Sequence, residues 1–264
     1  KEELNRIKKQ SNLQIYLGDV LGTYYLGFNL ESNSSLARSK EARKAINLAI
    51  DRKRIIENIL GDLGELAKGP IPPKIIDNSH LSGYSYNPNL AKEILRKEGL
   101  LSGEKIKVII RDEPETALFY RLSQYLIEDL QKLGLNLEIT KISPKDYLRP
   151  ETIAKCHIFI GRWIADTGDP DNYLQPIFNY NNLTNFTRYN NPKLVEMMDE
   201  AKKIINPNKK LEVYKKIQDI ILEDSPWAPI FHPKTAIVTR KGIVGARISP
   251  LGIINYENIL IESK

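Results

Sequence analysis

Residues Ile106-Lys107-Val108-Ile109-Ile110 form a short apolar run that predicts a β-strand. A helix is expected over 115–133, because Leu118, Leu122 and Leu126 recur there at helical spacing. The alternation then continues with a strand at 135–142, a short helix at 144–154 and a third strand at 156–163. Strands that alternate with helices favour a parallel sheet with right-handed crossovers. The central third of the chain therefore predicts an α/β fold.

Segments on either side of this core extend the same pattern. Ser39 can cap a helix that runs to about residue 60, and Asn87-Pro88 can open a short helix that ends at Gly99. Further helices are expected at 170–178, 192–205 and 207–223. The start of the chain, near 13–30, and the tail, 227–261, both read as extended strands. These strands could pair with each other or lead out to another lobe.

The composition restricts the class of protein. The chain has 264 residues, 41% of them hydrophobic and 27% charged, which is enough for a sizeable buried core. Its net charge is +6, but the lysines are spread along helices beside acidic residues, so we expect no nucleic-acid partner. No apolar run approaches the roughly 20 residues that span a bilayer. Cys156 is the only cysteine, which excludes an internal disulfide and a cysteine-based zinc site.

Candidate ligand contacts follow from the predicted sheet. Ligands of open α/β sheets bind beyond the carboxyl ends of parallel strands. Arg111 lies at one such end, and Trp163 and Asp166 lie at another. A cation, an aromatic surface and a carboxylate together would suit a zwitterionic ligand. Asp169 is a further candidate, although Asp169-Pro170 also reads as a helix start.

Structural roles compete with each of these assignments. Trp163 could be a core residue at a strand end, and the charge of Arg111 could be neutralised by the neighbouring Asp112 and Glu113. The histidines are far apart in sequence, and the Asp spacing differs from a calcium loop, so we expect no metal and no cofactor. Motifs for nucleotide binding or for nucleophilic catalysis are absent from the sequence. A hydrolase with paired acids stays open.

Five segments of the chain occur together in a fixed order. They are Tyr25-Leu26-Gly27-Phe28-Asn29, Arg43 to Arg52, Tyr86 to Leu95, Trp163 to Tyr173, and Pro250-Leu251-Gly252 with Tyr256-Glu257-Asn258. In these segments the chain resembles the dipeptide/oligopeptide-binding family of ABC-transporter solute-binding proteins, family 5. The third element departs from the family pattern, because Asn87 replaces the usual Asp.

The resemblance implies a fold of the periplasmic-binding-protein type II class, with a mixed, mainly parallel sheet flanked by helices. Residues 1–264 would form a single α/β ligand-binding lobe with hinge strands near 20–30 and 228–240. It further implies that the N-terminal lobe, a signal peptide and a lipid-anchor cysteine precede this segment. Asp51-Arg52 is expected to serve structure.

The resemblance also implies roles for single residues. Asp166 matches the family's Asp that binds the α-ammonium group of the peptide. The family's carboxylate-binding Arg falls at Glu113, two residues after Arg111. This departure puts strict dipeptide specificity in doubt, and Arg111 could replace the missing cation.

The function implied is that of a non-enzymatic, monomeric receptor for short peptides that docks on ABC permease subunits. Its expected location is extracytoplasmic, as a cell-surface lipoprotein or a periplasmic protein. The same fold could instead bind a metal chelate, haem, an oligosaccharide or a signalling peptide.

Overall fold

The computed structural model describes residues 1–262. The helices are α1 (Glu2–Lys8), α2 (Ser35–Arg38), α3 (Lys40–Ala49), α4 (Arg52–Ile55), α5 (Pro88–Lys97), α6 (Leu118–Lys132), α7 (Pro150–Ile153), α8 (Asp171–Phe178), α9 (Pro192–Lys203) and α10 (Pro207–Asp224). The strands are β1 (Leu13–Asp19), β2 (Gly22–Phe28), β3 (Gly64–Leu66), β4 (Lys105–Arg111), β5 (Asn136–Ile142), β6 (Ile158–Ile164), β7 (Trp227–Arg240), β8 (Ile243–Val244), β9 (Arg247–Ile248), β10 (Ile254–Asn255) and β11 (Leu260–Ile261). Within this part of the chain, no helix is both long and apolar enough to cross a bilayer.

The main sheet is mixed, as expected. Its strand order is β1-β7-β2-β6-β4-β5, and β3 pairs with β7. Strand β4 runs parallel to β5 and to β6, which confirms the predicted strand–helix–strand core. Strand β2 is antiparallel to both β6 and β7, and β1 is antiparallel to β7. The strands near the two ends of the chain therefore add antiparallel pairs, which outnumber the parallel ones, so the sheet is mixed but not mainly parallel as expected.

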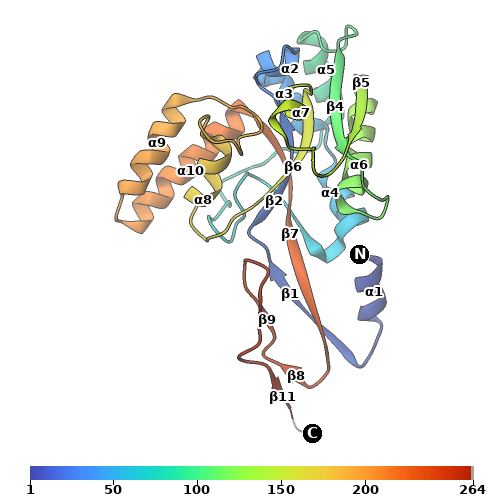
Figure 1. Ribbon diagram of the computed structural model, residues 1–264, viewed down its shortest axis with the longest axis vertical. Helices are drawn as coiled ribbons and strands as arrows, with labels where there is room; N and C mark the ends of the chain where they lie inside the picture. Colours follow the sequence, from blue (N-terminus) through green and yellow to red (C-terminus); the bar gives the residue numbers. More distant parts are fainter. Residues whose placement is uncertain (263–264) are drawn as a thin grey trace.

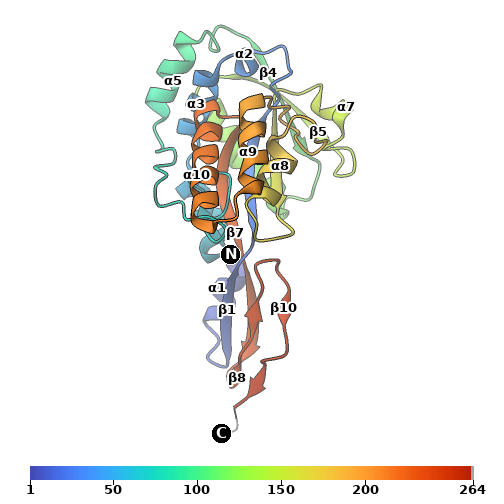
Figure 2. The ribbon, with the colours of Figure 1, turned by 90° about the vertical axis from the view of Figure 1, so that its left-hand side faces the viewer.

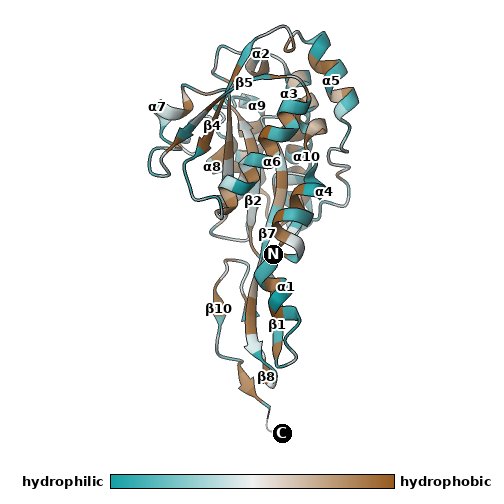
Figure 3. Ribbon diagram, turned by 90° about the vertical axis from the view of Figure 1, so that its right-hand side faces the viewer, coloured by the Kyte–Doolittle hydropathy of each residue, from teal (hydrophilic) through white to brown (hydrophobic). Residues whose placement is uncertain are grey.

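Helices cover both faces of this sheet (Figures 1 and 2). Helices α3, α5 and α6 pack on one face, where Ile46, Leu95 and Leu126 are fully buried against the strands. Helices α8, α9 and α10 pack on the other face, around a second cluster that includes Tyr25 and Trp227. Most residues of β4 and the first six residues of β7 are buried, whereas α5 carries both hydrophilic and hydrophobic residues (Figure 3). This is the pattern of a sheet that is buried on both faces beneath amphipathic helices.

Two glycines in the sheet make room for aromatic rings of the second cluster. Gly161 in β6 pairs with Tyr25 in β2, and Gly27 in β2 pairs with Phe159 in β6. A Cβ atom on either glycine would collide with the ring opposite. Each ring lies over a residue without a side chain, and Tyr25 then stacks on Trp227 with ring centroids 3.5 Å apart. The two glycines therefore position the aromatic layer that supports the end of β6.

Strand β7 is shared between the lobe and an extended arm. Its first residues pair with β2 and are buried, whereas its second half pairs with β1, from Asp19↔Lys234 to Leu13↔Arg240. The arm formed by β1 and the end of β7 projects from the lobe, with β8 to β11 beside it (Figures 1 and 2). The start and the tail of the chain thus pair with each other. The hinge strands expected near 20–30 and 228–240 correspond to β2 and β7, and their role as hinges stays a prediction.

Two buried arginines hold backbone carbonyl groups together. Arg52 donates hydrogen bonds to the carbonyls of Pro229, at 2.6 Å, and Asn47, at 2.8 Å. Burial lowers the pKa of Arg52 to about 10. Arg43 donates to the carbonyl of Asp224, at 2.7 Å, near the end of α10. The carbonyls of Asn47 and Asp224 lie in the last turns of α3 and α10, where carbonyls have no partner inside the helix, so the arginines act there as C-terminal caps. The bond to Pro229 ties α4 to β7. This agrees with a structural role for Asp51-Arg52.

The single helix predicted over 39–60 is wrong. Helix α3 ends at Ala49, Ile50 is extended, and a new helix begins at Arg52. The side chain of Asp51 accepts a hydrogen bond from the backbone of Arg54, at 3.0 Å, and so caps α4. An internal Asp competes for backbone donors and restarts the helix, a local effect that apolar periodicity does not reveal.

Other boundaries also differ from the predicted ones. The helix expected over 144–154 is reduced to α7, which has Pro150 at its first position, because turns occupy the preceding residues. Helix α6 begins at Leu118, three residues later than expected. Helix α8 begins at Asp171, with Pro170 as its N-terminal cap residue.

Candidate ligand-binding site

The carboxyl ends of β4 and β6 lie at the same edge of the sheet. The two strands are parallel, with Val108 opposite Ile158. Around Phe119, at the start of α6, the guanidinium of Arg111 lies 4.6 Å from the ring centroid and that of Arg162 lies 6.0 Å from it. The structure therefore brings the strand ends together, as the sequence predicts for a parallel pair.

Trp163 is partly buried and anchors the loop that follows β6. Its ring packs against the second cluster, and its Nε1 donates to the backbone carbonyl of Asn172, at 3.1 Å. Asn172 makes a second hydrogen bond to this loop: its Oδ1 accepts from the backbone N–H of Asp166, at 2.7 Å. The loop between β6 and α8 is thus closed by the strand end at one side and the helix start at the other.

Asp166 lies in this loop and is exposed. Its backbone is held by Asn172, but its carboxylate has no hydrogen-bond or ion-pair partner among residues 1–262. A fixed backbone that carries a free carboxylate is suited to bind a cationic group from outside.

Asp169 and Asp171 have protein partners instead. One oxygen of Asp169 accepts from the backbone of Asp171, at 2.9 Å, and the other lies 3.1 Å from Nζ of Lys210. Asp171 lies 3.7 Å from Lys202, and burial raises the pKa of its carboxyl group. Both residues therefore help to start α8, and Asp169 as a ligand contact stays a prediction.

Arg111 already has a carboxylate partner. Its Nη2 lies 2.5 Å from Oε1 of Glu113, and both side chains are largely buried, with exposed fractions of 25% and 15%. The pairing is the local neutralisation that the sequence left open as an alternative. A ligand would have to compete with Glu113 for this guanidinium.

Arg162 is a cation at this edge that the sequence analysis did not single out. It is exposed, and it lies opposite Tyr24 of β2, directly before Trp163. A charged residue inside an otherwise apolar predicted strand was the available signal, because a strand end that leaves the core exposes alternate side chains.

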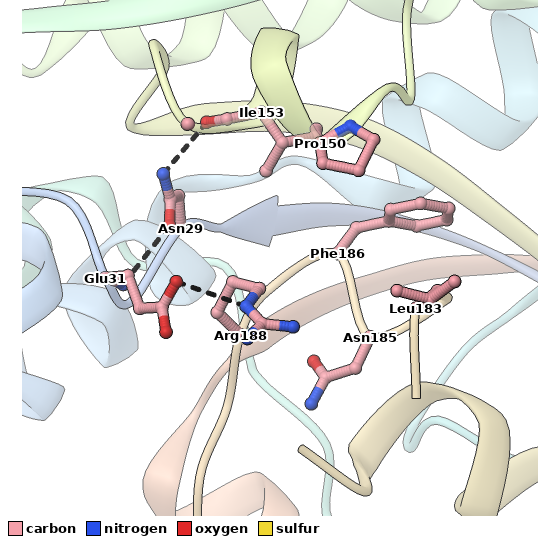
Figure 4. A pocket seen from close by; sticks show the side chains of 9 residues that line it. Asn29, Glu31, Pro150, Ile153, Leu183, Asn185, Phe186 and Arg188 are labelled. Carbon is pink, nitrogen blue, oxygen red and sulfur yellow. Dashed lines mark hydrogen bonds and ion pairs between the residues drawn. The ribbon is translucent and has the colours of Figure 1, made fainter. Parts of the chain in front are cut away.

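A cavity also lies at a distance from these strand ends. A cavity of about 480 Å³ lies at the opposite end of the sheet, beside Asn29 and Phe186 (Figure 4). One wall is an ion pair between Arg188 and Glu31, at 3.1 Å, and a hydrogen bond from Tyr180 lowers the pKa of Glu31. Asn29 follows β2, which is antiparallel to β6, so this cavity lies at the amino end of β6, away from Asp166.

The histidines are separated in the structure as in the sequence. His232 is buried in β7, where its Nδ1 lies 3.1 Å from the carbonyl oxygen of Gly22 and 3.0 Å from Oγ1 of Thr23. No group of three His, Cys, Asp or Glu side chains in the described residues is placed to hold a metal ion.

Comparisons with known proteins connect this arrangement with a family. Residues 1–185 match the bacterial extracellular solute-binding proteins, family 5, middle region. Heme-binding protein A of Haemophilus influenzae is 27% identical to the chain over 269 residues, which cover 99% of this chain and 48% of that protein. The dipeptide-binding protein of Escherichia coli is 24% identical over 266 residues, covering 98% and 49%.

The fold also has solved counterparts. The oligopeptide-binding protein of Bacillus subtilis, in complex with a nonapeptide, superposes with a TM-score of 0.79 at 19% identity, over 99% of this chain and 55% of that one. At this identity the likeness shows the fold alone. The chain spans about half the length of the relatives it matches.

The α/β lobe with a mixed sheet flanked by helices is thereby confirmed, and the family consists of solute-binding proteins, which are not enzymes. The hydrolase alternative is therefore set aside. The match covers most of the chain, and the chain belongs to the bacterial extracellular solute-binding proteins of family 5.

Proposed function

We propose that this chain is the ligand-binding lobe of an extracytoplasmic receptor for short peptides that serves an ABC importer. The observation that carries the proposal is the free carboxylate of Asp166, at the carboxyl end of a parallel strand and beside Trp163. Ligands of open α/β sheets bind at this position. Membership in a solute-binding family supports binding as the activity.

Asp166 binds the α-ammonium group of the peptide in this proposal. Its backbone is fixed by Asn172, so little conformational freedom is lost when the ligand arrives. Trp163 forms the adjacent aromatic wall, with its ring edge held through Nε1. A second lobe, joined through β2 and β7, closes over the ligand, and the closed monomer docks on permease subunits. A signal peptide and a membrane anchor belong to the same proposal.

The test is calorimetry on the full-length gene product with a pool of di- to tetrapeptides, followed by the best single peptide. Asp166→Asn should weaken binding about ten- to a hundredfold, because a charge-assisted hydrogen bond contributes roughly 1.5–3 kcal/mol. Asp112→Asn is the matched control, since Asp112 is exposed near the same edge and its side chain has no partner in residues 1–262. Equal losses in the two variants, or no loss in either, would remove Asp166 from the site.

Haem is the second candidate cargo, because heme-binding protein A is among the similar proteins. In the same experiment, haem is offered to the full-length gene product and binding is followed by the shift of its Soret absorption. Peptide binding without haem binding supports the first proposal, and the reverse result supports the second.

A further inference from the structure

Arg162 is held in place without an anionic partner. Its guanidinium carbon lies 6.0 Å from the ring centroids of both Tyr24 and Phe119, and Nη1 lies 3.4 Å from the hydroxyl of Tyr24. No carboxylate within residues 1–262 is at ion-pair distance from it. Aromatic faces orient a guanidinium but do not neutralise its charge.

Arg111 lies close to Arg162, but the two arginines differ in how their charge is balanced. Both guanidinium groups lie beside the same Phe119 ring, at 4.6 and 6.0 Å from its centroid. Glu113 neutralises Arg111 at 2.5 Å, whereas Arg162 has no such counterpart in the part of the chain that the structure describes. Two like charges near one ring repel each other, so an anion beside Arg162 would be favourable.

We propose that Arg162 binds the carboxylate of the ligand, so that Arg162 and Asp166 together select a short zwitterionic, peptide-like cargo. This inference rests on the proposed function, because it assigns the second charged contact of the same site. Arg111 does not take this role, because its guanidinium is already paired with the carboxylate of Glu113. Arginine is suited to the role because its planar fork can bind both oxygens of a carboxylate.

The spacing of the two residues limits the size of the ligand. Arg162 and Asp166 are four residues apart in sequence, so their Cα atoms can be separated by at most about 13 Å in an extended chain. Ile164 lies on the same strand face as Arg162 and is 39% exposed, which provides apolar surface between the two charges. A ligand of two to four residues, with charged ends and an apolar middle, fits this span.

The experiment compares one short peptide with its C-terminal amide on the full-length gene product, by calorimetry. The peptide is the tightest binder from the pool of di- to tetrapeptides. The wild-type protein should bind the free acid at least about tenfold more tightly than the amide. Arg162→Gln should remove that preference, mainly by weakening binding of the free acid, and should leave binding of the amide almost unchanged.

Two variants serve as controls. Arg111→Gln should keep the preference for the free acid, because Arg111 is paired within the protein. Arg162→Lys should keep part of it, since the charge remains but the planar fork is lost. Thermal unfolding of each variant shows whether the fold is intact.

The outcomes separate the two proposals. If Arg162→Gln keeps the full preference for the free acid, or if wild type shows none while Asp166→Asn still weakens binding, the role of Arg162 is wrong and the proposed function stands. If no peptide of the pool binds, the proposed function fails, and the assignment of Arg162 fails with it.

Discussion

The segment from Trp163 to Asp171 divides into residues with different tasks. Asp169 and Asp171 are engaged with the start of α8 and with lysines of α9 and α10. Trp163 donates its indole N–H to the backbone carbonyl of Asn172. Asp166 keeps a free carboxylate in the same segment. Of these three acidic side chains, those of Asp169 and Asp171 take part in capping contacts and ion pairs, whereas that of Asp166 has no such partner among residues 1–262.

His232 is the residue at which the structure predicts a pH effect on stability. The carbonyl of Gly22 can only accept, so we assign the ring proton to Nδ1, and the buried Nε2 has no hydrogen-bond partner among residues 1–262. Burial is the main cause that lowers the pKa of His232 to about 4 from an ordinary value of 6.5. In the folded protein the ring therefore stays neutral over most of the acidic range.

The sign of the effect follows from the two pKa values. Between pH 6.5 and pH 4 the unfolded chain binds a proton at His232 and the folded chain does not, so stability is lost as the pH falls through this window. We expect the free energy of unfolding to fall by about 2 kcal/mol between pH 7.5 and pH 5. Urea unfolding of the chain at both pH values measures it.

His232→Gln should flatten this pH dependence, even if it lowers stability at both pH values. His157→Gln is the control. Its ring is half-buried and its pKa is lowered in the same direction, chiefly by desolvation, so it should remove a smaller part of the slope. A slope that is unchanged in His232→Gln would show that other groups carry it.

Three helices of the chain begin with the same dipeptide. Asn87-Pro88, Asn191-Pro192 and Asn206-Pro207 open α5, α9 and α10, and in each the Asn side chain accepts from the backbone two residues after the Pro. Pro at the first position lacks an N–H that would be unpaired anyway. These starts were predictable because cap and Pro are both local signals. The start of α8 at Asp171 differs, since its preceding residues are engaged with Trp163 and Asn172.

Asn87 is the N-terminal cap residue of α5. Its Oδ1 accepts from the backbone of Leu90, at 3.1 Å, and α5 buries Ala91 and Leu95 in the first core cluster. Asn87→Ala should lower the free energy of unfolding by about 1 kcal/mol, whereas Asn87→Asp should preserve it. Urea unfolding compares both with Asn89→Ala, an exposed residue of the same turn without a capping bond. Equal stability of Asn87→Ala and Asn89→Ala would contradict the capping role.

At the scale of the whole molecule, the arm and the strand ends leave surfaces that a single lobe does not cover. Large apolar side chains are exposed on the tail, with Ile253 at 63%, Tyr256 at 70% and Ile261 at 82%. Exposed apolar groups that gather in one region mark an interaction surface. Together with a match to about half of the relatives' length, this supports the proposal that a second lobe packs beside the arm.

A second lobe should raise the affinity for the peptide. In the proposed receptor the ligand is enclosed between two lobes, and this chain supplies one wall of the cleft. The chain of 264 residues by itself should bind the selected peptide at least about tenfold more weakly than the full-length gene product, because fewer contacts and less burial are available. Calorimetry with the same peptide on both proteins measures the difference. Equal affinities would place all the binding contacts in this lobe.

The sequence by itself determined the α/β class, the order of the main strands and helices, and the helix starts at Ser39 and Asn87, because periodicity and capping act over a few neighbouring residues. It also placed Arg111 and Trp163 at strand ends. The tertiary structure decided which charges are free. The pairing of Arg111 with Glu113 was one of the alternatives that the sequence left open, and the structure chose it. Arg162 instead faces the rings of Tyr24 and Phe119, through contacts that depend on strand register and on where α6 begins. These contacts of Arg162 join residues distant in the chain, so local sequence does not fix them.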